Sequence, residues 1–541
     1  MSNICGTESC SQQGIDRAIL CLASPYLESS RVNLNEAVRY LDGLIWSQPL
    51  IYLCLGAGLY FSIRTRFMQI RGFTEMLRLT TSGKTSAAGV SSFQALAMSL
   101  SGRIGVGNIA GIATAIAAGG PGAIFWMWAM ALLGASTSYI ECTLAQIYKE
   151  KDNHGQYRGG PAYYIEKAMG QRWYAIAFAI STIVGTGLLL PTVQSYEIAS
   201  SVANAWSIPA WVSGIAVVIM LGVIIVGGVR RIASFAEIVV PFMALGYMLT
   251  AIVIMVLNAD QVPAMFALIM DNAFNPNAAF GGILGLAIQW GVKRGIYANE
   301  AGQGTGPHAA AAAEVSHPAK QGYVQAFSIY FDTAIVCTST AFIILSTRAY
   351  NVIHPETGAI LAENLPRVAD ATGAMVPAPA GAGYTQAAVE SVFSGFGASF
   401  VAIAILFFAF TTIVAYYYMA ETNLEYIARN RAPGWSLMLL KLLIMLSVGF
   451  GAVWSSEGVW ALGSIGVGIM AWLNIIAILI VQKPALLALR DYEAQKRQGL
   501  DPTFDPDKLG ITNAEVWHEI VRTTRSTPQT DVPAKAKPEV I

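Results

Sequence analysis

Charged residues are scarce in this chain of 541 residues. Asp, Glu, Lys and Arg together make up 12% of it, whereas soluble domains carry about 25%. The 33 basic and 33 acidic residues balance, so no excess of positive charge suggests nucleic-acid binding. Hydrophobic residues make up 55%, and long apolar runs recur along the chain. The sequence therefore predicts an all-α, polytopic membrane protein.

Metal-binding and catalytic patterns are also missing. The six cysteines form no CxxC or Cys/His spacing, and no apolar segment holds paired histidines or a nucleophile–base constellation. Cys54, Cys142 and Cys337 lie in apolar segments and are interpreted as packing residues. We therefore expect neither an enzyme nor a resident cofactor. The N-terminus lacks a basic stretch followed by an apolar core, so no cleaved signal peptide is expected.

Apolar periodicity predicts about eleven membrane spans within residues 43–483. The predicted spans are 43–62, 93–119, 122–147, 174–204, 209–227, 233–257, 279–301, 323–346, 389–418, 435–454 and 459–481. The span 389–418 is long enough for two helical pieces. In the polar tail, 484–541, a capping-box pattern at Thr512–Glu515 predicts a short helix over 513–522. The rest of the tail is predicted to be disordered.

Lys and Arg lie in alternate loops, which predicts the orientation. Basic residues follow the first span between Arg64 and Lys84, and recur between Lys149 and Arg172, whereas 258–278 contains none. This pattern places segment 1–42 outside and the C-terminus in the cytoplasm, as for a bacterial cytoplasmic-membrane protein. Cys5, Cys10 and Cys21 would then lie outside, where two of them could form a disulfide.

Two predicted spans contain glycine-rich interruptions. One is Gly105-Val106-Gly107-Asn108, within 93–119, and the other is Gly291 to Gly295, within 279–301. An unwound turn frees amides that can hold a carboxylate and carbonyls that can hold a cation, and lipid tolerates it only beside a cavity or ligand. With the first span set aside, the breaks fall in the first and sixth of ten spans. That spacing predicts a five-plus-five inverted repeat, 93–257 and 279–481.

Several uncharged side chains near these breaks are candidate ligands. Asn108 could coordinate a cation or cap the second half-helix. Gln194 could bind an amino-acid head group or bond another helix. Thr411 and Thr412 could form an oxygen cage for a monovalent cation or bond their own helix carbonyls. Trp290 could limit the pocket volume or be an ordinary packing residue.

Ionisable residues within spans are costly and indicate functional positions. Asp332 is the most central and could serve a cation or a proton. Arg103, beside the first break, could form an ion network with Glu141 or Glu300, and Lys293 and Arg294 flank the second. Glu197 belongs to the same set.

The run Gly105–Gly111 and the motif Gly119-Gly-Pro-Gly-Ala-Ile-Phe-Trp-Met-Trp128 closely resemble the alanine or glycine:cation symporter family. Gly159–Tyr164, Asn299–Gly302 and Thr411-Thr412 extend the resemblance over roughly 43–483. It implies a LeuT-type core with one extra N-terminal helix and import of alanine or glycine with sodium.

The resemblance also implies residue roles. Gly105, Val106, Gly107 and Asn108 match the family's first break, Val193 and Gln194 match its Val-Gln pair, Gly291 its second break, and Thr411 and Thr412 its paired hydroxyls. Two positions depart from the family. Val106 stands where Thr or Ser is usual, and Tyr196 stands where Asn is usual, which leaves the preferred substrate and its stereochemistry open.

The sequence as a whole predicts a symporter for small neutral amino acids such as alanine, glycine, D-alanine or serine, coupled to sodium. Substrate contacts are expected from Gly105, Val106, Gly107, Asn108, Gln194, Trp290 and Gly291, and sodium contacts from Gly105, Thr411 and Thr412. The alternative is a proton-coupled carrier that uses Asp332 or Glu141. A channel or a membrane enzyme has less support, and a monomer is expected to suffice.

Overall fold

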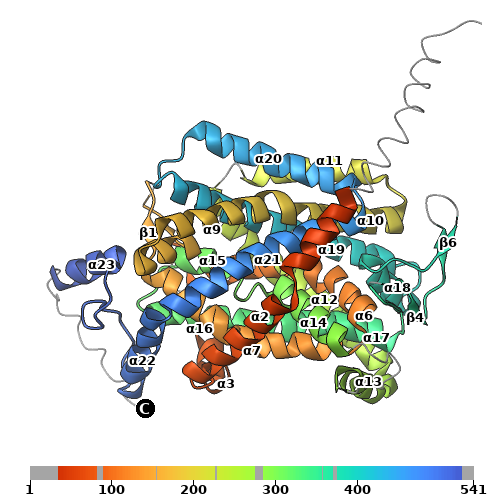
Figure 1. The fold of residues 1–541 in the computed structure, drawn as a ribbon, viewed down its shortest axis with the longest axis horizontal. Coiled ribbons are helices and arrows are strands. Elements are labelled where there is room, and N and C mark those ends of the chain that lie inside the picture. Colours follow the sequence, from red (N-terminus) through yellow and green to blue (C-terminus); the bar gives the residue numbers. More distant parts are fainter. Residues whose placement is uncertain are drawn as a thin grey trace, which may run out of the picture.

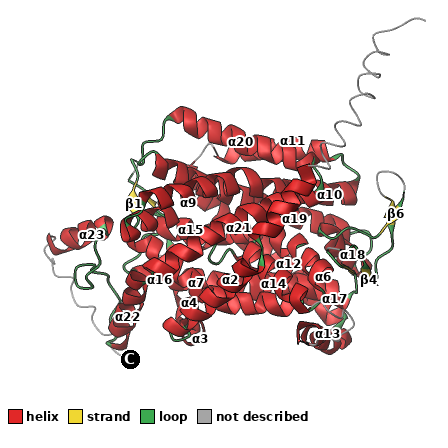
Figure 2. Ribbon diagram, in the orientation of Figure 1, coloured by secondary structure: helices red, strands yellow, loops and turns green. Residues whose placement is uncertain are grey.

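The computed structural model describes residues 34–81, 89–153, 155–225, 228–274, 284–355, 357–369 and 374–526. The N-terminal cysteines, with their predicted disulfide, lie outside these residues. The described chain is almost entirely helical (Figure 2). The long helices are Leu34–Ile45 and α2 (Gln48–Arg64), α5 (Ser92–Arg103) with α6 (Ala110–Gly119), α7 (Ala123–Ile147), α9 (Arg172–Val184) with α10 (Leu190–Trp206), α11 (Ala210–Ile225), α12 (Gly228–Leu257), α14 (Leu284–Asn299) with α15 (Gly306–Ala312), α16 (Pro318–Ile329) with α17 (Thr338–Ser346), α19 (Gly397–Ile427), α20 (Gly434–Val453) and α21 (Ser456–Val481).

Seven helices in the described chain are long and apolar enough to cross a membrane. An eighth is added if the bent pair Leu34–Ile45 and Gln48–Arg64 is counted as one span. The remaining predicted spans correspond to the interrupted helices α5–α6 and α14–α15 and to the shorter apolar helix α11. Each predicted span therefore has a helical counterpart. Within 389–418 the chain breaks between α18 (Ala382–Val392) and α19, and from Gly397 onward this span is one continuous helix.

The two interrupted helices pack against one another and against α7. Half-helix α6 contacts α14, while α5 and α15 contact each other, and both α14 and α15 lie along α7. On the other side, α10 packs against α19, α20 and α21, and α19 contacts α5. The junction of α5, α10 and α19 therefore lies inside the bundle, where lipid does not reach it.

Short elements cover the two ends of the bundle (Figure 1). One end holds α13 (Val262–Phe274), α18 and two antiparallel hairpins, which are β3 (Asn351–Ile353) with β4 (Ile360–Glu363) and β5 (Val368–Ala369) with β6 (Met375–Val376). The opposite end holds the hairpin of β1 (Glu150–Lys151) with β2 (Tyr157–Arg158), and the C-terminal helices α22 (Lys483–Arg497) and α23 (Glu515–Ser526). Helix α13 was not expected, because 258–278 was interpreted only as a loop.

The prediction of a largely disordered tail is wrong for residues 484–526. Helix α22 continues from α21 and buries Ala485, Leu486, Ala488, Leu489 and Tyr492 on one face, which is the periodicity of an amphipathic helix. Further along, Phe504 and Trp517 are buried and pack edge to face with ring centroids 5.1 Å apart. The predicted helix over 513–522 corresponds to α23. Apolar positions in the tail were present in the sequence, but its high polarity masked them.

Candidate functional site

The first predicted break is present in the structure. Helix α5 ends at Arg103, a short 3₁₀ turn spans Val106–Asn108, and α6 begins at Ala110. The side chain of Asn108 closes the turn, because its Oδ1 accepts the Gly105 N–H at 3.0 Å. Asn108 therefore closes the 3₁₀ turn itself, which differs from the predicted cap of the second half-helix, where no side chain of the described residues caps α6.

Three segments converge on Gly105. A Cβ atom at this position would lie 2.6 Å from Oγ1 of Thr412 and 3.1 Å from Oε1 of Gln194. Glycine is required here because any side chain would push α10 and α19 away from the break. Gln194 is buried, and its Oε1 accepts the N–H of Val106 at 3.1 Å. Four of the predicted site residues are thereby brought together.

The second break lies nine residues beyond its predicted start. Helix α14 runs without interruption through Gly291 and Gly295, so the prediction of an unwound turn there is wrong. The chain instead leaves the helix after Asn299, with positive φ at Glu300 (57°), Gly302 (80°) and Gly304 (86°). Residues 300–305 separate α14 from α15. The sequence signal was the glycine pair at 302 and 304.

Gly291 has a packing role in the structure. A Cβ atom there would lie 2.6 Å from both the Ala123 carbonyl oxygen and Cβ of Trp126 on α7. Small residues that allow two membrane helices to approach closely are typical of such contacts. The sequence alone could not distinguish a glycine that unwinds a helix from one that lets it pack.

Trp290 lies away from the first break. It is half-buried, its Cβ lies 3.0 Å from the position of a Cβ on Gly119, and its ring faces Lys293 and Arg294 at 5.3 and 5.2 Å. Gly119 is twelve residues from Gly107, or roughly 18 Å along a helix. The aromatic residue beside the break is Tyr297, whose ring would be 3.2 Å from a Cβ on Gly107. Sequence reasoning did not single out Tyr297.

Thr412 reaches several oxygens at once. Its Oγ1 lies 2.8 Å from the Ser101 carbonyl oxygen, 2.9 Å from that of Phe408 and 3.5 Å from that of Ile104. Thr411 donates to Phe408 O of its own helix (2.9 Å) and to Sδ of Met243 on α12 (3.9 Å). Neutral oxygens around one point suit a hard cation. Both threonines donate to the Phe408 carbonyl of their own helix, as in the predicted alternative, but only Thr412 also reaches carbonyl oxygens of α5, and this set of neutral oxygens fits a sodium ion.

Asp332 lies beside the first break, within a π-helical segment at Tyr330–Cys337. Its carboxylate accepts Nδ2 of Asn108 at 2.6 Å and the hydroxyl of Thr333 at 2.7 Å, and its side chain is fully buried. Both donors are neutral. A carboxylate in such a place is stable only as the neutral acid or beside a cation.

The predicted ion network around Arg103 takes another form. Arg103 donates to the hydroxyls of Ser328 and Ser138 rather than to a carboxylate. Glu141 accepts the N–H of Gly302 at 3.3 Å and Nδ2 of Asn474 at 2.7 Å, and so holds the second break. These polar groups therefore support the unwound segment 300–305.

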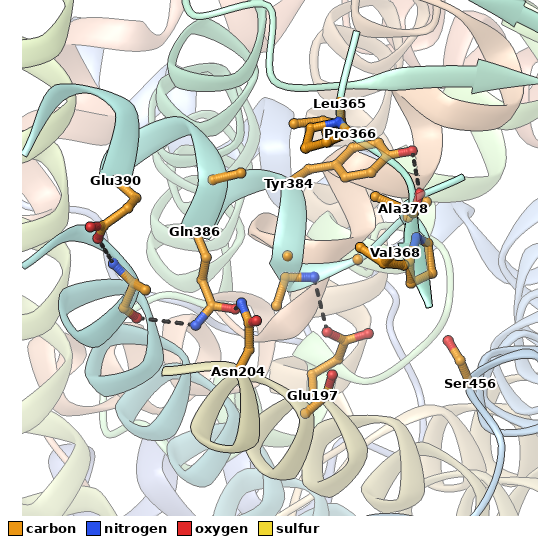
Figure 3. Close-up of a pocket in the computed structure, with 18 of the residues that line it drawn as sticks. Glu197, Asn204, Leu365, Pro366, Val368, Ala378, Tyr384, Gln386, Glu390 and Ser456 are labelled. Atoms are coloured by element: carbon orange, nitrogen blue, oxygen red, sulfur yellow. Dashed lines mark hydrogen bonds between the residues drawn. The ribbon is translucent and has the colours of Figure 1, made fainter. Parts of the chain in front are cut away.

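A cavity of about 540 Å³ opens at the end of the bundle that holds the hairpins (Figure 3). Its walls come from α10, α18, and the segments 365–368 and 378–381. Glu197 lines it and accepts the N–H of Ala382 at 3.1 Å and the indole N–H of Trp460 at 2.9 Å. Trp460, in α21, is a further residue that sequence reasoning missed.

A bundle of apolar helices with two broken helices meeting inside it defines a multi-pass membrane carrier. Residues 31–506 match the Sodium:alanine symporter family, and the chain belongs to that family. It is therefore a bacterial membrane transporter and not an enzyme.

Three relatives illustrate the range of the family. A Bacillus subtilis (strain 168) protein, named provisionally as a sodium/proton-dependent alanine carrier, is 56% identical over 90% of this chain and 98% of its own length. The sodium/proton-dependent alanine carrier protein of Bacillus sp. (strain PS3) is 53% identical over 82% and 97%. A probable sodium/glutamine symporter of Bacillus subtilis is 40% identical over 90% and 96%.

Proposed function

We propose that this protein imports small neutral amino acids, with alanine and glycine as the main substrates and sodium as the coupling ion. The observation that supports this most strongly is the junction of Gly105, Gln194 and Thr412. There the regular helical hydrogen bonding of α5 ends on one side, and a cluster of oxygens lies on the other. The names of two similar proteins, which both include alanine and sodium, agree with this substrate and ion.

The substrate would lie between the two breaks. The amide of Gly107 suits its carboxylate, because it lies just before the N-terminus of α6, the positive end of that helix dipole. Since Oε1 of Gln194 already accepts from Val106, its amide N–H₂ is the end available to an incoming carboxylate. Gln194 is therefore assigned to the carboxylate of the amino-acid head group. The substrate ammonium would face the carbonyl end of α14, near Tyr297.

The close contact between Gly107 and Tyr297 favours small substrates. The tyrosine ring and Val106 are both buried beside the break, so little room remains for a side chain larger than a methyl or hydroxymethyl group. D-Alanine and serine are of suitable size. We propose Tyr297 as the residue that limits size, in the role first predicted for Trp290.

Sodium would bind at Thr412, between the end of α5 and α19. Binding there would hold the first break in the conformation that accepts substrate, which couples the two ligands. A single charge moving through 100 mV provides about 2.3 kcal/mol, or roughly fifty-fold accumulation.

Proton coupling through Asp332 is the alternative. Its carboxylate is buried, has neutral partners and is bonded to Asn108 of the first break. A proton that enters or leaves it would change that contact. The two alanine carriers similar to this chain both have the proton in their names. In this alternative, Asp332 would replace or accompany the Thr412 site as the coupling group.

The architecture proposed with this function has eleven spans. Helix α2 with its bent partner precedes a five-plus-five inverted repeat whose first members are the broken helices α5–α6 and α14–α15. By the positive-inside rule, the end with α22 and α23 would face the cytoplasm and the end with the hairpins would face outside. All the proposed contacts come from one chain, so a monomer would suffice in the bilayer.

Uptake of radiolabelled alanine into proteoliposomes tests the proposal. A sodium gradient at equal pH should drive accumulation, and an inverted sodium gradient should abolish it. A proton gradient without sodium should have little effect. Accumulation driven by the pH gradient alone would favour the Asp332 alternative. If neither gradient drives alanine accumulation, both sodium coupling and proton coupling are rejected.

A further inference from the structure

The cavity that contains Glu197 lies one helical turn from the proposed substrate site. Gln194 and Glu197 are three residues apart on α10, which corresponds to about 4.5 Å along the helix axis. Gln194 bonds the first break, whereas Glu197 lines the cavity. Ser200 and Asn204, further along α10, also line the cavity. A polar path therefore runs along α10 from the cavity to the break.

Trp460 lies between Glu197 and Tyr297. Its indole N–H donates to Glu197, and its ring lies against that of Tyr297 with centroids 5.4 Å apart and planes tilted by 45°. The far edge of the indole lies 3.8 Å from a Cβ position on Gly111, at the start of α6. Tyr297 in turn packs on Gly107. The indole is thus the layer between the cavity floor and the two breaks.

Two oppositely charged side chains, Arg294 and Glu197, contact Trp460 but form no ion pair with each other in the described chain. The Arg294 guanidinium lies 4.2 Å from the centre of the indole ring, and within the described chain its Nε and Nη1 have no hydrogen-bond partner. Glu197 accepts two neutral donors, and a carboxylate has capacity for about four. Arg294 and Glu197 are both at least 95% buried. A ligand with one cationic and one anionic group would satisfy both.

We propose that this cavity is an outer binding site for the zwitterion of a small amino acid, with Glu197 as the receptor for its ammonium group. Trp460 is the gate between this cavity and the inner site, and when its indole moves aside, Arg294 becomes accessible to the substrate carboxylate. This proposal rests on the proposed function for its ligand class and for the outward direction of the cavity. The cavity, at about 540 Å³, is far larger than a sodium ion needs. Its apolar wall, with Leu365, Pro366 and Val368, suits an organic side chain.

The backbone conformation beside Glu197 indicates a preformed binding site. Gly381 has a φ of +154°, a conformation that side chains rarely adopt, and a Cβ there would lie 3.3 Å from the Glu197 carboxylate. This turn directs the next N–H, that of Ala382, at Glu197 (Figure 3). The carboxylate is therefore fixed in position before any ligand arrives.

The test is ligand protection of a thiol in the cavity. In the full-length chain, with Cys5, Cys10 and Cys21 replaced by serine, Ser200→Cys puts a thiol on the cavity wall. An impermeant methanethiosulfonate reagent is added outside proteoliposomes with increasing alanine. Alanine should slow the labelling. Alaninol, which keeps the ammonium group, should protect as well, whereas N-acetylalanine and sodium alone should not.

Two substitutions separate the outer site from the inner one. Gln194→Ala should abolish transport yet leave the protecting concentration of alanine unchanged. Glu197→Gln should raise that concentration about ten-fold or more, because a bond to a charged group is lost. Glu457→Gln, a carboxylate exposed at the same end of the bundle, is the matched control and should change nothing.

Results opposite to these expectations would overturn either the outer site or the inner one. Protection that disappears with Gln194→Ala would arise from the inner site and would overturn the outer one. Labelling that is absent, or protection by N-acetylalanine, would also overturn it. If Glu197→Gln does not fold, the comparison of alaninol with N-acetylalanine in the parent protein still decides. Normal transport by Gln194→Ala would instead reject the proposed inner site.

Discussion

The hydroxyl of Thr412 donates to the carbonyl oxygen of Ser101 at 2.8 Å, across the contact between α19 and α5. Ser101 is in the last turn of α5, where the helix is about to end and its carbonyls lose their usual partners. The neighbouring Thr411 makes no such contact. Two adjacent threonines with one substitution each can therefore separate a role in ion binding from a role in helix packing.

Thr412→Val should weaken sodium binding while nearly preserving shape. We expect the sodium concentration for half-maximal alanine uptake to rise ten-fold or more, because one of the clustered oxygens is removed. Thr411→Val should change it less than three-fold. The measurement is sodium activation of uptake in proteoliposomes, with folding checked by size-exclusion chromatography. Equal effects of the two variants, or none, would contradict the assignment of sodium to Thr412.

Tyr297→Leu should widen the substrate range. Removing part of the ring beside Gly107 should admit valine and weaken alanine binding by about 1–3 kcal/mol. Trp290→Leu is the matched control on the same helix and should keep the parental range, since Trp290 backs onto Gly119. Competition of unlabelled amino acids against alanine uptake measures both. Valine transport by the Trp290 variant alone would restore the original prediction for that residue.

Gly291→Ala should destabilise the protein instead of altering its gating. The added methyl would meet the Ala123 carbonyl and Trp126 at 2.6 Å, and overpacking of this kind costs about 1–3 kcal/mol. Gly246→Ala, in α12, has no atom within 4 Å of the new methyl and should be neutral or slightly stabilising. Thermal unfolding in detergent compares the two. A Gly291 variant of parental stability with altered transport would indicate a hinge.

His317 should make the packing of α22 on α16 sensitive to acid. Nδ1 of His317 accepts the N–H of Ala319 at 3.1 Å and Nε2 faces Asp491 at 3.2 Å, which requires the neutral ring. Burial lowers the pKa of His317 below its usual value, despite the attraction of Asp491. The unfolded ring binds a proton first, so the stability is complete above about pH 6.5 and falls as the pH drops below it.

Thermal unfolding between pH 5 and 8 measures this effect. The midpoint of the parent should fall as the pH decreases through 6.5. His317→Asn, which keeps a capping side chain without a titrating ring, should reduce the slope. If both proteins lose stability in parallel, the acid sensitivity comes from another group.

The orientation can be tested with single cysteines. Asp260→Cys, at the end with the hairpins, should react with an impermeant thiol reagent added to intact cells. Asn153→Cys, in the β1–β2 turn, should react only after the membrane is opened. Both positions are exposed. The reverse pattern would invert the proposed topology.

The positions of the spans could be predicted because apolar runs of membrane length are long and bounded by charge. The first break could also be predicted, since Gly105 and Gly107 are followed by Asn108, a polar side chain suited to closing the turn. The second could not. Gly291 and Gly295 look equally suited to unwinding, and only the approach of α7 reveals that they serve packing. The positive φ values at Glu300, Gly302 and Gly304 depend on support from Glu141, more than 150 residues away.

The outer cavity also could not be predicted from the sequence. Glu197 could be recognised as an intramembrane carboxylate, but its partners Ala382 and Trp460 come from segments 185 and 263 residues away. Contacts over such separations depend on the tertiary arrangement of the helices.

The packing of the tail has a consequence for biosynthesis. Phe504 and Trp517 are translated after every span, yet the indole N–H of Trp517 bonds the carbonyl of Gln146, near the end of α7, and the N–H of Phe504 bonds the carbonyl of Ser316. These parts of the bundle end must remain uncovered while the helices insert. The tail therefore docks last in folding. A chain truncated near residue 500 would still insert in the membrane but would lack the contacts of Phe504 and Trp517 with this end of the bundle.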